Sequence, residues 1–312
     1  MHVVLVGPGA LGCLLASRLV RGDTTEGYRF TLLDHNGARA GELNSRGISY
    51  VYKGEQEQVR LPVSSSPVET GPAEVVILCV KSYDIGNCLR FCAPLLTPDT
   101  LLLFMQNGVA HLGEPIPGDC GTPAYGTTTE GANLLAPGQV CHAGKGLTQF
   151  GFLGPVDERA VQQLRRVTEM FNAAGLKARM SEGILDRLWT KLMVNTGING
   201  LTATLGCPNG ELLTRTDAAE RMARLVAEAQ QVARASAIQV PEDSLEITRD
   251  VCNKTAANIS SMLQDVRCRR RTEIDAINGA VVAAGKKLGL DTPENLRLVR
   301  QVKELEKSYL NG

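Results

Sequence analysis

The segment Gly7-Pro8-Gly9-Ala10-Leu11-Gly12 decides the fold. It fits the pattern Gly-x-Gly-x-x-Gly and lies between a predicted strand, His2–Val6, and a predicted helix, Ala10–Val20. In such a loop the first glycine permits a tight turn, the second lets the backbone approach a pyrophosphate, and the third allows close helix–strand packing. The helix N-terminus offers free N–H groups and a positive dipole end to the phosphates. The segment therefore predicts a dinucleotide site formed by Gly7, Pro8, Gly9, Ala10, Leu11 and Gly12. The alternative is a glycine-rich turn that binds no ligand.

The first part of the chain alternates apolar strand patterns with helical patterns. Strands are predicted over Phe30–Asp34, Glu74–Val80 and Thr100–Met105, and glycine-rich segments around residues 121–131 and 144–154 suggest further strands. The Glu74–Val80 run is almost continuously apolar, as buried parallel strands are. This alternation predicts an α/β fold with a Rossmann-type doubly wound sheet.

From about residue 181 the strand patterns stop and helical periods dominate. We therefore predict a dinucleotide-binding (Rossmann) domain over residues 1–180 and an all-α substrate or catalytic domain over residues 181–312. The predicted helices are Ser181–Leu205, as one helix or as two with a break near Gly197–Gly200; Asp217–Ser236; a helix that opens at Pro241–Asp243 and runs past Arg267; Thr272–Leu288; and a last helix that opens at Thr292-Pro293-Glu294.

Composition excludes several classes of function. The 312 residues include 33 Lys+Arg and 33 Asp+Glu, and this balance gives no support for a nucleic-acid partner. The N-terminus does not resemble a signal peptide, and no apolar run is long enough to span a membrane, so we expect a cytoplasmic protein. Nine cysteines without a Cys-x-x-Cys pair favour a reducing compartment, and neither they nor the four histidines predict a metal site.

Three polar residues share one face of an otherwise apolar predicted helix. Lys191, Asn195 and Asn199 are spaced i, i+4 and i+8. Burying these groups unpaired would be costly, so we expect them to face a polar cavity. The alternative is a solvated polar stripe on an amphipathic helix.

A second group of polar residues follows in the last third of the chain. Asn258 and Ser261 are spaced i, i+3 and would share a helix face, and Glu273 lies further along. A serine hydroxyl and an asparagine amide can bind a carboxylate, and a glutamate can orient a hydroxyl. Glu273 could instead form a surface ion pair with Arg269 or Arg270.

Polar residues also follow two of the predicted strands. Val80-Lys81-Ser82-Tyr83 follows one strand, and Met105-Gln106-Asn107-Gly108 follows the next. Doubly wound folds bind their ligands at the carboxyl ends of strands, which makes both segments candidates. Asn107-Gly108 could equally be an ordinary turn.

The end of the predicted strand Phe30–Asp34 bears on cofactor choice. Asp34 could hydrogen-bond a ribose diol, which favours NAD and would repel a 2′-phosphate. His35 and Arg39 could instead hold that phosphate, so these residues alone leave NAD and NADP open.

Together these segments resemble the ketopantoate reductase (2-dehydropantoate 2-reductase) family over nearly the whole chain. The resemblance rests on Gly7–Gly12, Val80-Lys81, Gln106-Asn107-Gly108, Gly126-Thr127-Thr128-Thr129, Leu188-Trp189-x-Lys191-Leu192-x-x-Asn195-x-x-x-Asn199, Cys207-Pro208-Asn209-Gly210-Glu211, Asn258-Ile259-Ser260-Ser261-Met262-Leu263-Gln264-Asp265 and Thr272-Glu273-Ile274-Asp275-x-x-Asn278-Gly279. The motifs of the second half are more specific than the glycine loop.

The resemblance implies NADPH-dependent reduction of 2-dehydropantoate to (R)-pantoate, on the route to pantothenate and coenzyme A. It implies that Lys191 is the catalytic acid, with Glu273 and Asn107 also at the reacting centre. The implied substrate-binding residues are Asn107, Asn195, Asn199, Asn209, Asn258 and Ser261. The implied cofactor-binding residues beyond the glycine loop are His35, Lys81, Asn107, Ala132 and Glu273.

One departure from the family concerns the cofactor. Many members place an arginine just after the second strand, where this chain has His35. NADPH is the expected cofactor, and NADH is the alternative. The expected partners are a small keto acid and, at most, a second copy of the chain, since the sequence leaves monomer and homodimer open.

These residues suit ketone reduction. Negative charge develops on the ketone oxygen as hydride arrives, and a cationic Lys191 can stabilise that charge and donate the proton. We expect the site in the cleft between the two domains. One alternative is a related reductase of another 2-keto acid, and a non-enzymatic alternative is a nicotinamide-sensing regulatory protein.

Overall fold

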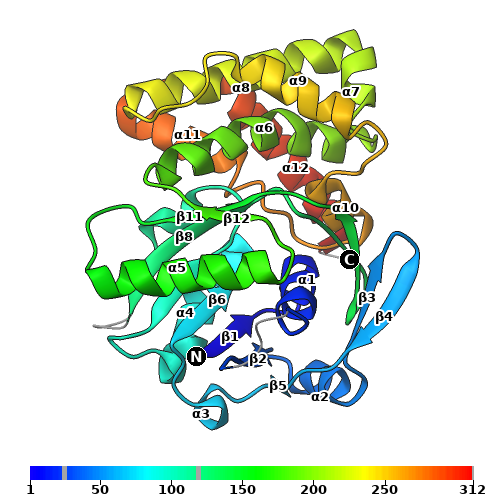
Figure 1. Ribbon diagram of the computed structural model, residues 1–312. Helices are drawn as coiled ribbons and strands as arrows, with labels where there is room; N and C mark the ends of the chain where they lie inside the picture. The colour runs from blue at the N-terminus through cyan, green and yellow to red at the C-terminus, as the bar shows by residue number, and fades with distance from the viewer. Residues whose placement is uncertain (23–26, 117–120, 311–312) are drawn as a thin grey trace. The chain divides into compact units, whose positions relative to one another are not determined.

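The computed structural model describes residues 1–22, 27–116 and 121–310 (Figure 1). The chain divides into two compact units. The first comprises Met1–Gln106 and Glu114–Ile184, and the second comprises Asn107–Gly113 and Leu185–Gly312. No helix among the described residues combines the length and the apolar character needed to cross a membrane.

The first unit is built on an eight-stranded sheet, which confirms the predicted α/β class. Its strand order is β12-β11-β8-β7-β6-β1-β2-β5, and the pairs from β5 to β8 are parallel while β11 runs antiparallel to β8. Every residue of β1, β6 and β7 is buried, which explains why these strands are apolar throughout except for His2 at the start of β1. The strands are β1 (His2–Val6), β2 (Arg29–Leu33), β5 (Val63–Ser64), β6 (Val75–Leu78), β7 (Leu101–Phe104), β8 (Thr122–Thr128), β11 (Thr148–Gly151) and β12 (Ala178–Met180).

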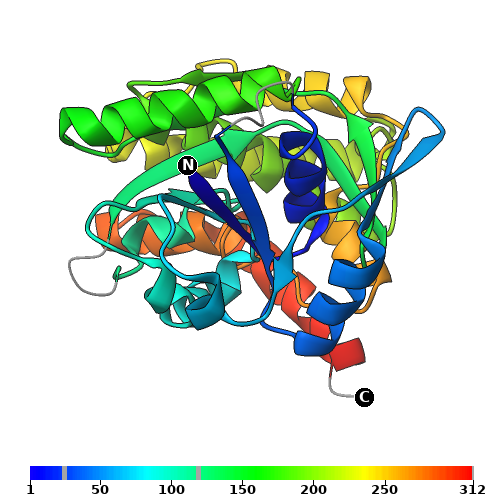
Figure 2. The same cartoon turned by 60° about the horizontal axis from the view of Figure 1, so that its bottom comes forward.

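A second, four-stranded sheet completes this unit. Its order is β4-β3-β10-β9, and helix α1 contacts β1 of the first sheet as well as β3, β9 and β10 (Figure 2). The hairpin of β3 and β4 was not predicted; its turn, Lys53-Gly54, has positive φ at both residues (51° and 84°). The strands are β3 (Ile48–Tyr52), β4 (Glu55–Val59), β9 (Gly131–Ala136) and β10 (Gln139–Gly144).

The helices of the first unit pack against these sheets around a shared apolar core. Phe150 on β11 meets Phe171 on α5 edge to face, with ring centroids 5.0 Å apart. The eight cysteines that the structure describes are free thiols, and Cys120 lies outside the described residues. The helices are α1 (Ala10–Leu19), α2 (Gly37–Arg46), α3 (Pro67–Thr70), α4 (Ile85–Cys92) and α5 (Glu158–Ala173), with 3-10 turns η1 (Ser82–Asp84) and η2 (Ala93–Leu95).

The second unit is helical, but two predicted helices differ from the structure. The helix predicted to run past Arg267 is wrong, because α9 ends at Lys254 and α10 starts anew after Ser260, whose hydroxyl accepts a hydrogen bond from the Leu263 N–H. The helix predicted over Thr272–Leu288 is wrong for residues 272–277. The elements are η3 (Ala110–Gly113), α6 (Ile184–Leu205), α7 (Glu211–Thr214), α8 (Thr216–Ala235), α9 (Ser244–Lys254), α10 (Ser261–Arg267), α11 (Asn278–Leu288) and α12 (Pro293–Leu310).

Helix α6 is a single helix, which confirms the first of the two predicted alternatives; it has no break near Gly197–Gly200. A Cβ at Gly197 would lie 2.9 Å from Val226 Cγ2, and a Cβ at Gly200 would lie 2.7 Å from Leu298 Cδ2. The two glycines therefore serve close helix packing against α8 and α12.

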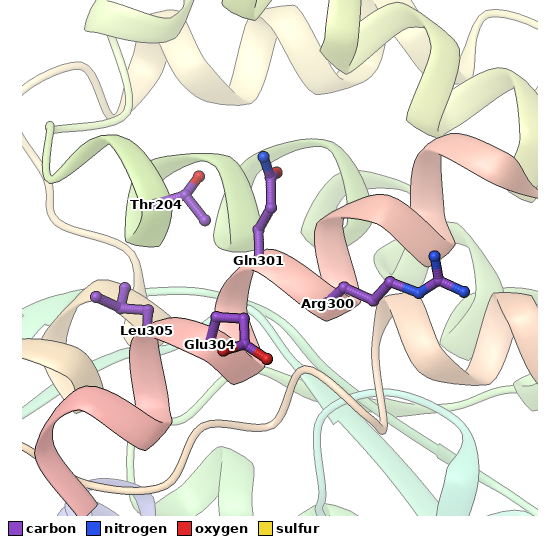
Figure 3. Close-up of a pocket in the computed structure, with 5 residues that line it drawn as sticks. All are labelled: Thr204, Arg300, Gln301, Glu304 and Leu305. Carbon is purple, nitrogen blue, oxygen red and sulfur yellow. The ribbon is translucent and has the colours of Figure 1, made fainter.

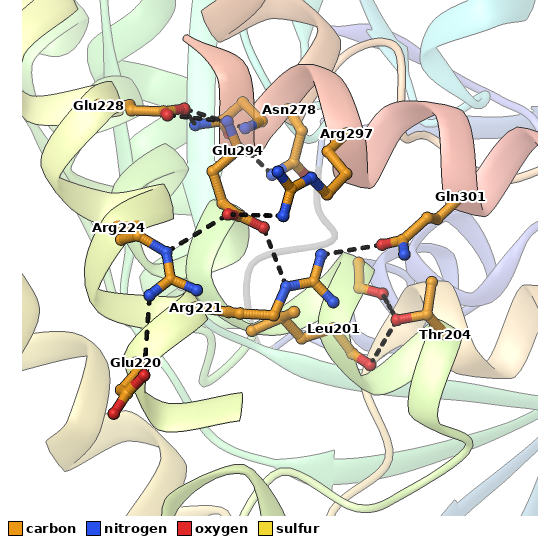
Figure 4. A network of polar contacts seen from close by, with 12 residues as sticks. Leu201, Thr204, Glu220, Arg221, Arg224, Glu228, Asn278, Glu294, Arg297 and Gln301 are labelled. Carbon is orange, nitrogen blue, oxygen red and sulfur yellow. Dashed lines mark hydrogen bonds and ion pairs between the residues drawn. The ribbon is translucent and has the colours of Figure 1, made fainter. Parts of the chain in front are cut away.

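A network of charged residues joins α8 to the start of α12 (Figure 4). Glu294 accepts hydrogen bonds from Arg221 at 2.9 Å and Arg224 at 3.3 Å. Glu228 of α8 accepts from the backbone N–H groups of Glu294 and Asn295 at 2.8 and 2.9 Å. A carboxylate at a helix N-terminus satisfies free N–H groups and the helix dipole, so Glu228 fixes where α12 begins.

A buried polar triad lies in the four-stranded sheet. The Tyr50 hydroxyl is 2.8 Å from His142 Nδ1, and His142 Nε2 is 2.5 Å from a Glu130 carboxylate oxygen. The side chains of Glu130 and His142 are each only 1% exposed. Glu130 lies in the connection from β8 to β9, so the triad ties that connection to β3 and β10.

We predict that this triad makes the free energy of unfolding depend on pH in the acid range. Burial raises the pKa of Glu130, but hydrogen bonds from His142 and the Gly146 backbone, together with the nearby charges of His142 and Lys145, outweigh it and hold the pKa below its usual value. The stabilisation is therefore present above the ordinary carboxylate pKa and is lost as pH falls through the lowered one. Glu130→Gln should lower the free energy of unfolding at neutral pH by about 1–3 kcal/mol.

Chemical denaturation followed by circular dichroism, from neutral to acid pH, measures this effect. The difference between wild type and Glu130→Gln should shrink as the pH falls. The exposed Glu169 provides a control, and Glu169→Gln should change little at any pH. A Glu130→Gln effect of constant size across the series would contradict the proposed linkage.

Candidate active site

Three predicted residues meet in the second unit. Lys191 Nζ on α6 donates to Asn107 Oδ1 at 2.9 Å, and Asn107 Nδ2 donates to Glu273 Oε2 at 3.4 Å. The Asn107 amide thus turns its oxygen to the ammonium and its nitrogen to the carboxylate. Glu273 is 6% exposed, so it is a buried residue of this cluster rather than a surface side chain.

A close approach of two backbone segments brings Asn107 to Glu273. Gly108 has φ of +78°, and a Cβ there would lie 2.0 Å from the Ala276 carbonyl oxygen. The Val109 N–H donates to the same carbonyl at 3.3 Å. Only glycine fits such a position, so Asn107-Gly108 is more than an ordinary turn.

The surroundings of Lys191 alter its acidity. Its side chain is partly exposed, yet it is densely surrounded by protein. Burial lowers the pKa of Lys191 to about 8, and the nearby Glu273 carboxylate opposes that shift. A lysine with a pKa near neutrality can both hold and release a proton at physiological pH.

The other predicted substrate residues of α6 are available for binding. Asn195 and Asn199 follow Lys191 by one and two turns, and Asn199 is 6% exposed. Within the described part of the chain neither side chain makes a hydrogen bond to protein. The Thr202 hydroxyl donates to Ser260 Oγ at 2.7 Å, which ties this helix to the turn before α10.

That turn carries the remaining predicted substrate residues. Asn258 precedes α10 and Ser261 is its first residue, so the expectation that they share a helix face is wrong. Asn209 joins them, since its N–H donates to the Asn258 carbonyl at 3.0 Å and its side chain donates to Thr255 at 2.9 Å. Both Asn258 and Ser261 are exposed and, among the described residues, their side chains have no hydrogen-bond partner.

One pocket of the second unit is lined by other residues. It has a volume of about 410 Å³ and is lined by Thr204 of α6 and four residues of α12 (Figure 3). None of the predicted site residues lines it. The α12 residues are Arg300, Gln301, Glu304 and Leu305.

In the first unit the glycine loop fits a dinucleotide. Gly7 has φ of +97° and packs on Val80, and a Cβ at Gly12 would lie 2.0 Å from the Gly7 carbonyl oxygen. A Cβ at Gly9 would meet open space. The first and third glycines therefore shape the loop, and the second leaves room for a phosphate at the N-terminus of α1.

Asp34 and Arg39, which the sequence offered as alternative cofactor contacts at the end of β2, form an ion pair with each other. Arg39 donates to both carboxylate oxygens of the buried Asp34, from Nε at 2.5 Å and from Nη2 at 2.7 Å. This hydrogen bond raises the pKa of Arg39. The His35 side chain is 77% exposed beside them. Asp34 is thus already neutralised by a cation, which the sequence spacing did not indicate.

Two further predicted cofactor residues also belong to the first unit. Lys81 follows β6 and directly precedes η1, and Ala132 lies on β9 opposite His142 of β10. The structure therefore places Lys81, Ala132 and the glycine loop in one unit, and Lys191 and Glu273 in the other.

Comparisons with known proteins agree with this architecture. Residues 3–155 match the family model "Ketopantoate reductase PanE/ApbA", and residues 183–306 match "Ketopantoate reductase PanE/ApbA C terminal". The 2-dehydropantoate 2-reductase of Halobacterium salinarum is 34% identical over 94% of this chain and 95% of its own length.

Two solved structures share the fold over 99% of both chains. A PanE/ApbA family ketopantoate reductase from Ralstonia eutropha has a TM-score of 0.87 at 28% identity. A D-mandelate dehydrogenase with NADH and anilino(oxo)acetate has a TM-score of 0.88 at 26% identity.

The glycine loop and the lysine-bearing helical unit define a nicotinamide-dependent oxidoreductase. The chain belongs to the ketopantoate reductase family, which confirms the resemblance read from its motifs.

We predict that Lys191 titrates near pH 8 rather than at the usual lysine value. Reductive ¹³C-methylation followed by NMR reports the pKa of each lysine, and loss of one signal in Lys191→Arg assigns it. In Glu273→Gln the pKa of Lys191 should fall further, because the opposing carboxylate charge is gone. The exposed Lys254 serves as the control. A signal for Lys191 that titrates with the ordinary lysines would contradict the described environment.

Proposed function

We propose that this protein reduces 2-dehydropantoate to (R)-pantoate with NADPH, the ketone reduction of pantothenate and coenzyme A biosynthesis. The observation that carries the proposal is the Lys191 ammonium, held by Asn107 beside Glu273 and with its pKa lowered to about 8. Family membership and the curated relatives that bear the name 2-dehydropantoate 2-reductase support the substrate.

The residues of this chain have separate tasks in the reaction. The dihydronicotinamide, when bound, supplies the hydride. Lys191 stabilises the negative charge that develops on the ketone oxygen and then donates a proton to it. Asn107 holds the ammonium in place, and Glu273 keeps the lysine protonated enough to act near neutral pH.

Substrate binding falls to polar side chains that have no hydrogen-bond partner among the described residues. Asn195 and Asn199 extend from the same helix as Lys191 and can bind the hydroxyl of the substrate. Asn258 and Ser261 can bind its carboxylate, and Asn209 braces Asn258 through the backbone. Amide and hydroxyl donors that are not used within the protein can hydrogen-bond a carboxylate with little rearrangement.

We predict that 2-dehydropantoate is preferred over other keto acids. The likeness to D-mandelate dehydrogenase makes an aromatic 2-keto acid the second candidate substrate. Steady-state assays with 2-dehydropantoate, 2-oxoisovalerate and phenylglyoxylate should give the first a kcat/KM at least about tenfold higher.

Lys191→Ala should lower kcat by about 10²–10⁴, and the exposed Lys254→Ala is the matched control. Faster turnover of phenylglyoxylate would establish the second candidate. NADPH binding without turnover of any keto acid would favour a nicotinamide-sensing protein.

The Asp34–Arg39 pair supports NADPH. A free carboxylate at the end of β2 would accept hydrogen bonds from a ribose diol and repel a 2′-phosphate. Here Arg39 neutralises Asp34 and is 37% exposed, so part of its guanidinium can meet a phosphate, with His35 alongside. Asp34 then positions the arginine instead of binding the ribose.

We predict that this pair sets the cofactor preference. Arg39→Ala should lower the ratio of kcat/KM for NADPH to that for NADH by about tenfold or more, because a charge-assisted contact is lost and Asp34 is exposed to the phosphate. The ratio should survive Arg46→Ala, since that exposed arginine of α2 pairs only with Glu42 among the described residues. A wild-type enzyme that prefers NADH would overturn this assignment.

A further inference from the structure

Gln106 is a buried residue that the proposed reaction does not use. It lies two residues beyond the end of β7 and is 5% exposed. Its side-chain Nε2 donates to the carbonyl oxygens of Leu78 at 2.9 Å and Val80 at 3.2 Å. One amide group therefore joins the carboxyl ends of β7 and β6, where a doubly wound sheet binds its ligand.

The bond to Val80 reaches a carbonyl that lies beyond the β6 strand. Ladder hydrogen bonds continue to Cys79, whose N–H donates to the Val6 carbonyl at 2.8 Å. β6 ends at Leu78, so Val80 lies outside it and needs another partner for its carbonyl. Gln106 provides that partner and so fixes the backbone just before Lys81.

Val80 in turn supports the glycine loop. A Cβ at Gly7 would lie 2.8 Å from Val80 Cγ1 and 3.1 Å from the Val80 nitrogen. Gly7 is the first glycine of the loop and its own N–H donates to the Leu33 carbonyl at 3.0 Å. A shift of Val80 would therefore disturb the turn that receives the pyrophosphate.

The chain accepts an energetic penalty to keep this amide. Gln106 Oε1 is buried and has no hydrogen-bond partner among the described residues. An unsatisfied buried acceptor is destabilising, and a side chain kept for stability alone would avoid it. We therefore attribute the role of Gln106 to the hydrogen bonds that its Nε2 donates to the two carbonyls.

We propose that Gln106 is a positioning residue for the cofactor: its amide holds Val80 against Gly7 and sets the start of the Lys81 segment. The inference rests on the proposed function, since it assumes that the loop binds a nicotinamide dinucleotide. Gln106 acts through the backbone of Val80 and not through contact with the substrate or the reacting atoms.

A matched control exists at the other end of the same two strands. Thr100 is fully buried just before β7, and its hydroxyl donates to the Ala73 carbonyl, near the start of β6, at 2.7 Å. Thr100→Val removes one buried side-chain–backbone bond between these strands at the amino edge of the sheet. Gln106→Met removes the corresponding bonds at the carboxyl edge with little change in volume.

The experiment measures the dissociation constant of NADPH by calorimetry and the kinetic constants with 2-dehydropantoate. Gln106→Met should raise the Kd of NADPH about tenfold and raise the KM for NADPH by a larger factor than it lowers kcat. Thr100→Val should lower the thermal midpoint but leave the Kd within about twofold. Gln106→His keeps an N–H donor near the two carbonyls and should recover most of the affinity.

Other results would contradict either the role of Gln106 or the proposed function, and the two cases can be told apart. Tight NADPH binding by Gln106→Met, or an equal loss in Thr100→Val, would overturn the role of Gln106. If Gln106→Met does not fold, the Gln106→His variant decides. A tenfold loss of NADPH affinity in Gln106→His, despite its retained N–H donor, would also overturn the role of Gln106. A wild-type protein that fails to bind NADPH would instead refute the proposed function.

Discussion

The hydrogen bond from Lys191 to Asn107 is the interaction on which the candidate active site depends. An ammonium group surrounded by protein needs a partner, and here a neutral amide accepts from it while donating to Glu273. The negative charge of that carboxylate opposes the loss of basicity that burial imposes on Lys191. The result is a lysine with a pKa of about 8, which can lose its proton to a developing alkoxide.

Two backbone features make that interaction possible. α6 presents Lys191, Asn195 and Asn199 on one face, and Gly197 and Gly200 let it pack closely against α8 and α12. Gly108 allows Asn107 to reach the turn that carries Glu273. Glycines thus serve the second unit by permitting contact, much as they shape the phosphate loop of the first.

The sequence predicted the parts of the molecule that are governed by local patterns. Buried parallel strands such as β6 and β7 are continuous apolar runs, and the spacing of Lys191 and Asn195 follows the helical period. The hairpin partner β4, Glu55–Val59, was missed because four of its five residues are polar and exposed. The end of α9 was missed because the sequence does not reveal that Ser260 caps a new helix. A serine at that position is equally compatible with a continuous helix.

Contacts between distant residues could not be predicted in the same way. Lys191 and Asn107 are 84 residues apart, and no spacing rule relates them; only the family resemblance suggested that they act together. The Asp34–Arg39 pair spans a strand–helix turn, where helical periodicity does not apply, so its two residues were considered as alternatives. Both contacts are set by tertiary packing, which the sequence pattern does not encode locally.

The pH dependence of the reduction tests the central claim most directly. Single-turnover oxidation of bound NADPH by saturating 2-dehydropantoate should slow as the pH rises through about 8, because Lys191 then loses the proton that it must donate. In Lys191→Met the much slower rate should no longer change across that range. A wild-type rate that stays constant through this pH range, or a variant that keeps the same profile, would contradict the role of Lys191 as the proton donor.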